Sequence, residues 1–179
     1  VVIKSNGIPT VSKLWLACGQ ELARQYGVEM VPLDVDYAAY RLIQDAAELD
    51  VVVTPNLFGD ILSDLGGVLL GSRGMCFSGS FSASGHAVYQ TNHGAAHDLT
   101  GSDRANPVAQ ILSLAMMLRE SFGLTSESGL IERAVRQLWS EGFRTEDLRE
   151  PHCRIIGTSE VGKRVAENVS KLGRLAVKS

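Results

Sequence analysis

Short runs of apolar residues alternate with longer segments of helical periodicity, and this alternation constrains the fold more than any other feature of the chain. Residues 1–3, 28–33 and 51–53 have the character of strands, and the last run is expected to be fully buried. The spacing of apolar residues predicts helices over 11–26, 37–48, 57–70, 107–122, 131–139 and 158–172. Strands that alternate with helices in this way predict an α/β protein.

The composition excludes several classes of protein. The 179 residues include 17 Lys and Arg against 20 Asp and Glu, and the net charge of −3 argues against a strongly basic nucleic-acid binder or a polybasic membrane anchor. No apolar run approaches the roughly 18 residues of a spanning helix. Three widely spaced cysteines form no CxxC pair, which is typical of reduced thiols in the cytosol. We therefore expect a cytoplasmic protein without nucleic-acid or membrane partners.

The character of the sequence changes near Gly71. From there to Gly101, the chain is dominated by Gly, Ser and short apolar residues, as expected for strands and loops. A helix then begins around Asn106, because Asn caps a helix and the proline that follows fits the first turn. The shift suggests a boundary between residues 1–70 and residues 71–179.

The sharpest local pattern is Asn-Leu-Phe-Gly-Asp-Ile-Leu-Ser-Asp over residues 56–64. On a helix, Asp60 and Asp64 share one face, with Cβ atoms about 5–6 Å apart. Two carboxylates this close repel each other unless a cation lies between them, and Mg²⁺ prefers such oxygen ligands. The alternative is a solvated acidic face, although apolar residues surround the pair. Asp36, after a predicted strand, is either a third ligand or a helix N-cap.

Lys4 and two histidines also carry possible chemistry. Lys4 follows the apolar residues 1–3, where a lysine can have a lowered pKa and act as an acid or base; otherwise it is a solvated strand-end lysine. His93 and His97 have the spacing of a zinc pair, but the Glu of HExxH is absent. A loop of small residues whose amides approach a phosphate fits this stretch better, and Asp98 could accept hydrogen bonds from ribose hydroxyls.

Two nucleotide-binding signatures are missing or incomplete. No GxGxxG occurs, so the usual Rossmann fingerprint is absent. Residues 157–163 match the first seven places of a Walker A loop, but Arg164 follows where Mg²⁺ needs a Ser or Thr hydroxyl. Thr158 and Ser159 are instead expected to cap the last helix. A module that binds a nucleoside triphosphate around Gly157 is therefore a minor alternative.

Residues 56–64 resemble the metal-binding helix signature of the isocitrate/3-isopropylmalate dehydrogenase family. Further similar segments follow in the family's order: Lys4-Ser5-Asn6, Val35-Asp36, His93-Gly94-Ala95-Ala96-His97-Asp98, Arg104-Ala105-Asn106-Pro107 and Gly157-Thr158-Ser159-Glu160. The resemblance covers essentially the whole chain but only the C-terminal half of the family's usual length. It implies a three-layer α/β fold that binds a dinucleotide without GxGxxG. It also implies oxidation and decarboxylation of a 2-hydroxy acid with a second carboxylate, using NAD or NADP and Mg²⁺ or Mn²⁺.

The resemblance implies a catalytic centre that two subunits share. Lys4 and Asp36 would be the catalytic residues, with Lys4 helping to move the hydroxyl proton. The divalent metal would be held by Asp36, Asp60 and Asp64. In the family, the lysine and the first of these acids face the site of the partner subunit, so the resemblance implies a homodimer.

The resemblance assigns the dinucleotide largely to the second part of the chain. Residues 71–179 would belong to the cofactor-side domain, and residues 1–70 would complete the central, dimer-forming domain. Asn6 would lie near the nicotinamide and Asn106 beside the adenine. Asp98 stands where relatives that use NADP tend to carry a basic residue, and it would repel a 2′-phosphate, so NAD is favoured. The implied cofactor-binding residues are Asn6, His93, Gly94, Ala95, Ala96, Asp98 and Asn106.

Some positions depart from the family's pattern. Family members often read Glu-Pro-Val-His-Gly-Ser-Ala-Pro-Asp where residues 90–98 read Gln-Thr-Asn-His-Gly-Ala-Ala-His-Asp. Residues 4–7, with Trp15 downstream, are more similar to the tartrate and D-malate dehydrogenase branch. The family's substrate-binding arginines and catalytic tyrosine have no counterpart here. The best expectation is an activity like that of 3-isopropylmalate dehydrogenase; the alternatives are a tartrate or D-malate substrate, or a truncated, inactive fragment that dimerises.

Overall fold

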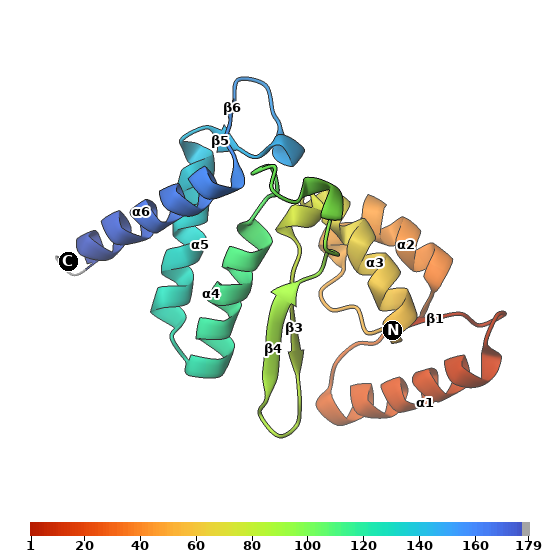
Figure 1. Cartoon of the computed structure of the whole chain (residues 1–179). Coiled ribbons are helices and arrows are strands. Elements are labelled where there is room, and N and C mark those ends of the chain that lie inside the picture. The colour runs from red at the N-terminus through yellow and green to blue at the C-terminus, as the bar shows by residue number, and fades with distance from the viewer. Residues whose placement is uncertain (177–179) are drawn as a thin grey trace. The chain divides into compact units, whose positions relative to one another are not determined.

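The computed structural model describes residues 1–176 of the chain. The molecule consists of two compact units, Val1–Leu69 (unit 1) and Leu70–Ser179 (unit 2). Helices dominate both units, and each sheet in the described part has two strands (Figure 1). No helix among these residues combines the length and the apolar character that a membrane span requires. The protein is therefore a mixed α/β protein, as the alternating pattern predicts.

Unit 1 is organised around a short pair of parallel strands. Its elements are β1 (Val2–Ile3), α1 (Pro9–Tyr26), β2 (Leu33–Asp34), α2 (Val35–Gln44), the 3-10 turn η1 (Ala46–Glu48) and α3 (Asn56–Leu69). Val2 pairs with Leu33, and the Val2 N–H donates to the Val53 carbonyl at 2.8 Å. β1 therefore lies between β2 and the segment that contains Val53, and Lys4 follows directly at its carboxyl end.

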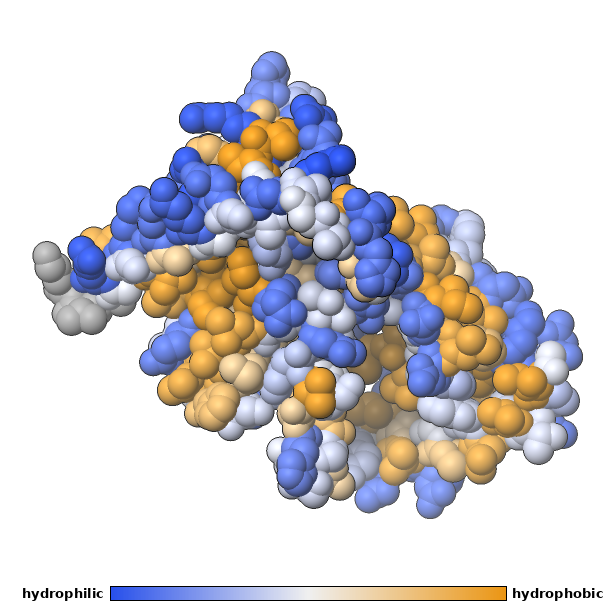
Figure 2. Space-filling view, viewed as in Figure 1, coloured by the Kyte–Doolittle hydropathy of each residue, from blue (hydrophilic) through white to orange (hydrophobic). Residues whose placement is uncertain are grey.

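A small apolar core holds unit 1 together. Its buried residues are Val2, Ala38 and Leu62, and α2 packs against α3 around them. α1 ends at Gly27, whose φ of 65° is a left-handed conformation that glycine adopts without strain. Many other apolar side chains of this unit are exposed, and Figure 2 shows apolar surface over α2 and α3. The core is therefore small for the number of apolar residues that the unit contains.

Some sequence predictions for unit 1 are wrong in extent. The predicted strand over 28–33 shrinks to β2, which begins only at Leu33. The predicted helix over 37–48 ends at Gln44 and continues as the separate turn η1. Residues 51–53 are assigned no strand and are not buried, since Val51 is 81% exposed. Burial depends on which neighbours cover a run, and local composition does not specify them.

Unit 2 packs a β-hairpin and helices around a larger core. Its elements are η2 (Arg73–Met75), β3 (Phe77–Phe81), β4 (Ala87–Thr91), η3 (His97–Leu99), α4 (Val108–Phe122), α5 (Thr125–Ser140), β5 (Phe143–Arg144), η4 (Glu146–Leu148), β6 (Arg154–Ile155) and α6 (Thr158–Ala176). β3 and β4 run antiparallel, whereas β5 and β6 are parallel. The buried Ser113 joins α4 to the hairpin, because its hydroxyl donates to the Gln90 carbonyl at 2.8 Å. The helices predicted over 131–139 and 158–172 are present and longer than expected.

The core of unit 2 lies where α4, α5 and α6 meet. Val108, Leu138 and Val161 contribute one buried side chain from each of these helices. Phe143 closes the core at β5, and the Arg164 guanidinium carbon lies 3.9 Å from the centroid of its ring. A cation over an aromatic face is attracted to it, so Arg164 covers this edge of the core while its Nε pairs with Glu160 at 2.7 Å.

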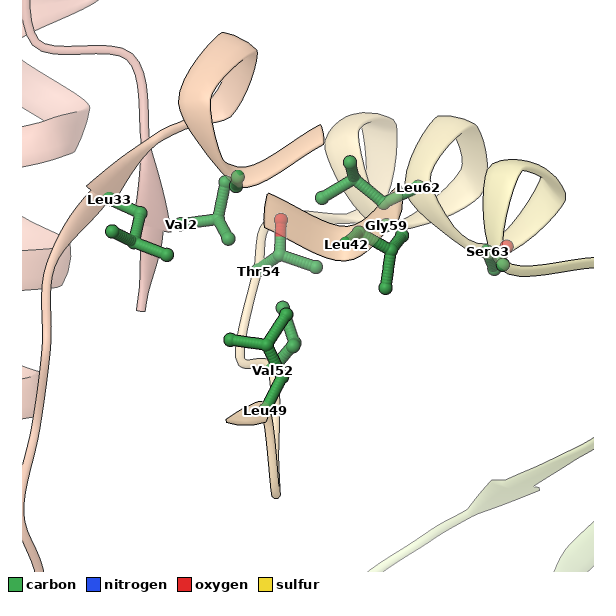
Figure 3. A pocket seen from close by; sticks show the side chains of 11 residues that line it. Val2, Leu33, Leu42, Leu49, Val52, Thr54, Gly59, Leu62 and Ser63 are labelled. Atoms are coloured by element: carbon green, nitrogen blue, oxygen red, sulfur yellow. The ribbon is translucent and has the colours of Figure 1, made fainter. Parts of the chain in front are cut away.

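An apolar cavity of about 260 Å³ opens in unit 1. Figure 3 shows its walls, which include Val2, Leu42, Leu62 and Val52. Such a lining has few groups that could bind a charged acid. The candidate lysine and metal ligands are not among the lining residues. The cavity is therefore distinct from the candidate site.

Candidate functional site

Lys4 and Asp36 form an ion pair at the carboxyl end of the β1–β2 strands. Lys4 follows β1 directly, and Asp36 lies in the first turn of α2, just after β2. Lys4 Nζ lies 2.8 Å from Asp36 Oδ1. The parallel pairing of the strands explains this contact, because parallel strands end at the same edge of a sheet. The fold thus brings the two predicted catalytic residues together.

The two charges of this pair stabilise each other. The hydrogen bond with Asp36 raises the pKa of Lys4, and the same bond lowers the pKa of Asp36. The idea of a lowered pKa for a buried strand-end lysine is therefore wrong, because Lys4 faces a carboxylate and not an apolar wall. The side chain of Lys4 is 30% exposed and that of Asp36 is 72% exposed. Both groups are accessible to a substrate or to a second subunit.

Asp34 fixes the turn that carries Ser5 and Asn6. Its two carboxylate oxygens accept the Ser5 backbone N–H at 2.7 Å and the Ser5 hydroxyl at 2.9 Å. These two hydrogen bonds, the backbone one first, lower the pKa of Asp34. The buried Ser12 donates its hydroxyl to the Lys4 carbonyl at 2.9 Å. The exposed Asn6 therefore follows a backbone segment that is anchored from two sides.

Asp60 and Asp64 lie one helical turn apart on α3, as the sequence predicts. Leu62 is 6% exposed and turns the other face of the helix toward the core of unit 1. Asp60 is exposed, whereas Asp64 is half-buried. The helix thus presents carboxylate oxygens, which are the ligands that Mg²⁺ and Mn²⁺ prefer.

A metal site on this pair needs a further donor. Within residues 1–176, one copy of the chain contains no group of three or more His, Cys, Asp or Glu side chains that could hold a metal ion. Asp36 therefore does not join Asp60 and Asp64 in the same copy. Two carboxylates one helical turn apart fit a divalent cation when another oxygen donor, from a substrate or a second subunit, completes the set.

The remaining predicted cofactor residues lie between β4 and α4. His93 begins this segment, and Ala96 has a φ of 44°, a left-handed conformation that is uncommon for a residue other than glycine. η3 follows, and the Leu99 N–H donates to the Ala96 carbonyl at 2.9 Å. One loop therefore carries His93, Gly94, Ala95, Ala96 and Asp98. We call residues 92–107, which connect β4 to α4, the cofactor loop after this prediction.

Asp103 holds the far end of the cofactor loop against α6. Its Oδ1 accepts the backbone N–H and the hydroxyl of Ser159, each at 2.8 Å, and its carbonyl accepts the Thr158 N–H at 2.9 Å. The hydrogen bonds from Ser159 lower the pKa of Asp103. The predicted cap by Thr158 and Ser159 is therefore wrong, since the carboxylate that caps α6 comes from another segment. The same bonds occupy the amides that a triphosphate at Gly157 would need.

α4 begins at Val108 with Pro107 at the capping position, one residue later than predicted, and Asn106 lies just before this cap. The Asn106 Oδ1 accepts the Val108 N–H at 3.0 Å, which satisfies one of the free donors at the helix start. Its Nδ2 donates to Asp147 Oδ2 at 3.0 Å. The residue is half-buried, so part of its amide remains accessible.

Comparison with known proteins identifies the family. The sequence model described as isocitrate/isopropylmalate dehydrogenase matches residues 1–165. The chain belongs to the isocitrate/isopropylmalate dehydrogenase family. The 3-isopropylmalate dehydrogenase of Nitratidesulfovibrio vulgaris is 46% identical over 169 residues, which are 94% of this chain and 47% of the relative. That of Geobacillus kaustophilus is 48% identical over 161 residues, 89% of this chain and 43% of the relative.

Solved structures of the isocitrate/isopropylmalate dehydrogenase type share this fold. The isocitrate dehydrogenase of Methylococcus capsulatus superposes with a TM-score of 0.87 at 35% identity, over 94% of this chain and 49% of that one. The β-decarboxylating dehydrogenase of Thermococcus kodakarensis gives 0.80 at 34% identity, over 96% and 49%. The predicted family and fold class are therefore confirmed. The chain spans about half the length of these relatives.

Three acids near the candidate site, Asp34, Asp103 and Asp147, are not predicted from the sequence. Each is a single carboxylate with a hydrogen-bond partner far away along the chain, 29 residues for Asp34, 41 for Asp147 and 56 for Asp103. Such pairs leave no local spacing signal. The left-handed φ of 53° at Asp103 indicates a functional or structural constraint, but it is visible only in three dimensions.

Replacing Gly157 with Ala is expected to destabilise unit 2 by about 1–3 kcal/mol, because the added methyl group overpacks a closed contact. A Cβ at this position would lie 2.6 Å from the Asp103 carbonyl oxygen. Thermal unfolding followed by circular dichroism measures the loss. Gly162→Ala on the same helix is the matched control, since nothing lies within 4 Å of its Cβ position. Equal unfolding midpoints for the two variants would show that the contact is not tight.

Proposed function

We propose that the protein takes part in the NAD- and divalent-metal-dependent oxidative decarboxylation of a 2-hydroxy dicarboxylic acid, with a 3-isopropylmalate-like substrate as the first choice. The single observation that carries this proposal is the Lys4–Asp36 pair at 2.8 Å. It joins a proton-carrying group to a carboxylate that the same family pattern assigns to the metal. The similarity to enzymes named 3-isopropylmalate dehydrogenase supports the choice of substrate.

Lys4 is the group that would move the substrate's hydroxyl proton. Its ammonium donates to Asp36, so the lysine is held in one orientation before a substrate arrives. The raised pKa of Lys4 keeps it protonated in this state. Lys4 must therefore lose this proton first, for example when its bond to Asp36 is weakened; the neutral amine can then accept the substrate's hydroxyl proton and return it later.

Asp60 and Asp64 would hold the divalent cation, with Asp36 reaching the site from a second subunit. This arrangement accounts for the absence of a group of three such ligands within residues 1–176 of one copy. A bound divalent cation supplies Lewis-acid stabilisation of negative charge on the substrate oxygens, and NAD supplies the hydride acceptor. We therefore propose a homodimer in which each site takes residues from both subunits.

The cofactor loop would hold the adenosine half of NAD. Its small residues at positions 94–96 let the backbone approach a phosphate or a ribose closely. Asp98 is exposed and would repel the 2′-phosphate of NADP, which favours NAD. Asn106, at the start of α4, would contact the adenine, and the exposed Asn6 would lie near the nicotinamide.

A second candidate is a protein that dimerises without turnover. The observation that favours it is the exposed apolar face of α2 and α3, because large unpartnered apolar surfaces mark interaction sites. That face includes Tyr37, Tyr40, Ile43, Leu57 and Ile61.

A turnover assay separates the two candidates. The chain is joined to the amino-terminal part of the N. vulgaris relative, the part that this chain does not match, and also assayed alone. NADH formation is followed with 3-isopropylmalate, D-malate, tartrate and isocitrate. We expect NADH from at least one substrate, its loss when EDTA removes the metal, and its return with Mn²⁺ or Mg²⁺. Dimer formation with no turnover on any substrate in the joined protein would favour the second candidate and reject the first.

A further inference from the structure

The carboxylate of Asp147 is the meeting point of three segments of unit 2. Asp147 lies in the short turn η4, and its Oδ2 accepts the Asn106 amide at 3.0 Å. Although Asp147 is exposed as a residue, its carboxylate is partly enclosed. That enclosure by itself raises the pKa of Asp147. Hydrogen bonds to the carboxylate, including those from Ser72 and Asn106, together have a larger opposite effect, so the pKa lies below its ordinary value. Asp147 is therefore ionised at neutral pH.

The η2 turn packs tightly against this carboxylate. Ser72 caps η2 by accepting the Gly74 N–H at 3.0 Å, and it also bonds to Asp147. A Cβ at Gly74 would lie 2.7 Å from the Asn106 Cβ and 3.1 Å from Asp147 Oδ2. Such a contact requires glycine, so the backbone of η2 closes directly over the Asn106–Asp147 pair.

The two partners of Asn106 leave its amide only one orientation. Ionised Asp147 only accepts hydrogen bonds, so it must face the NH₂ group of Asn106. The Val108 N–H only donates, so it must face the Asn106 oxygen. The NH₂ group of Asn106 keeps one further N–H to donate, and its oxygen keeps one further lone pair to accept with. A primary amide with a free N–H and a free lone pair can match the adjacent donor and acceptor on the edge of adenine.

We propose that Asp147 is a positioning residue for the adenine end of the dinucleotide, because it fixes the orientation in which Asn106 reads the base. The inference rests on the proposed function, since it assumes that the cofactor loop binds NAD. Asp147 acts only through Asn106. Without Asp147, only the Val108 N–H still holds the Asn106 amide, so its orientation is less firmly fixed and the preference for adenine weakens while the fold persists.

The test compares NAD with deamino-NAD, in which hypoxanthine replaces adenine and exchanges the amino donor for a carbonyl acceptor. The 179-residue chain is titrated with each dinucleotide by isothermal calorimetry. The unaltered chain is expected to prefer NAD. In Asp147→Ala, NAD affinity is expected to fall about three- to tenfold, the value of one or two hydrogen bonds, while deamino-NAD affinity changes little. Asn106→Ala is expected to lose the same preference, and the double variant to lose no more than either single one.

Two further variants separate positioning from folding. Glu146→Ala removes the neighbouring acid of η4, which pairs with Arg149, and is expected to leave both affinities unchanged. Asp147→Asn keeps an acceptor oxygen and is expected to retain more of the NAD preference than Asp147→Ala. Thermal unfolding of every variant is measured alongside.

Three outcomes overturn the inference or its basis. Equal loss of both dinucleotides in Asp147→Ala, tracking a lower melting temperature, would make the role purely structural. Equal binding of both dinucleotides by the unaltered chain would show that Asn106 does not read the base, although the proposed function would stand. No binding of NAD, by the chain alone or joined to the N. vulgaris part, would reject the proposed function itself.

Discussion

Replacing Lys4 with methionine is expected to lower turnover about 10²–10⁴-fold in the chain joined to the amino-terminal part of the N. vulgaris relative, because a positioned acid–base group contributes an effect of this size. Methionine has a similar length but carries no proton, and it cannot donate to Asp36. Steady-state NADH formation at saturating substrate measures the loss. NAD affinity is expected to change much less than turnover, since most of the proposed cofactor residues lie on the cofactor loop in unit 2.

Lys13 provides the matched control for this experiment. It is an exposed lysine on α1, and Lys13→Met is expected to leave turnover unchanged. Asp36→Asn separates the two roles of the pair: it should raise the metal concentration needed for half-maximal turnover as well as lower turnover itself. A Lys4→Met variant whose only defect is a higher KM would contradict a role in proton transfer, because the chemical step would then be intact.

Replacing Leu138 with alanine is expected to lower the free energy of unfolding of unit 2 by about 2–5 kcal/mol. Leu138 is 1% exposed, and it lies in the core formed by α4, α5 and α6. Truncation removes buried methyl groups and leaves a cavity that the surrounding helices can fill only in part. Urea unfolding followed by circular dichroism measures the change.

Leu175 is the control for Leu138, because it is the same residue type on α6 but is 65% exposed. Leu175→Ala is expected to shift stability by less than about 0.5 kcal/mol. A similar midpoint for the two variants would show that the core around Leu138 is not closed in solution. The size of the expected difference makes this the most direct test of the packing of unit 2.

The sequence predicts best those helices whose ends are marked by a capping residue or a glycine. α1 ends at Gly27, and α4 starts after Asn106 and ends at Gly123, because caps and left-handed glycines act within a few residues. Residues 51–53 show the opposite case. Their composition is that of a buried strand, yet Val51 is 81% exposed, because burial is decided by segments distant in the sequence.

The candidate site, too, could be predicted from the sequence only where the signal is local. Asp60 and Asp64 could be paired from their spacing alone, since one helical turn places them on one face. Lys4 and Asp36 are candidates because each follows a predicted strand; the resemblance adds their roles, and the fold supplies the parallel strands that join them. Their positions in the sequence give no hint that a hydrogen bond with Asp36 raises the pKa of Lys4. Interactions of that kind appear only once the strands are paired.

The clasp between Asp103 and Ser159 has a consequence for how the protein is made. The two residues are 56 positions apart, so α4 and α5 lie within the loop of chain that this clasp closes. During synthesis, the end of the cofactor loop cannot take its final shape until residues 157–159 have left the ribosome. The end of the cofactor loop must therefore wait for a partner that lies 56 residues further along the chain.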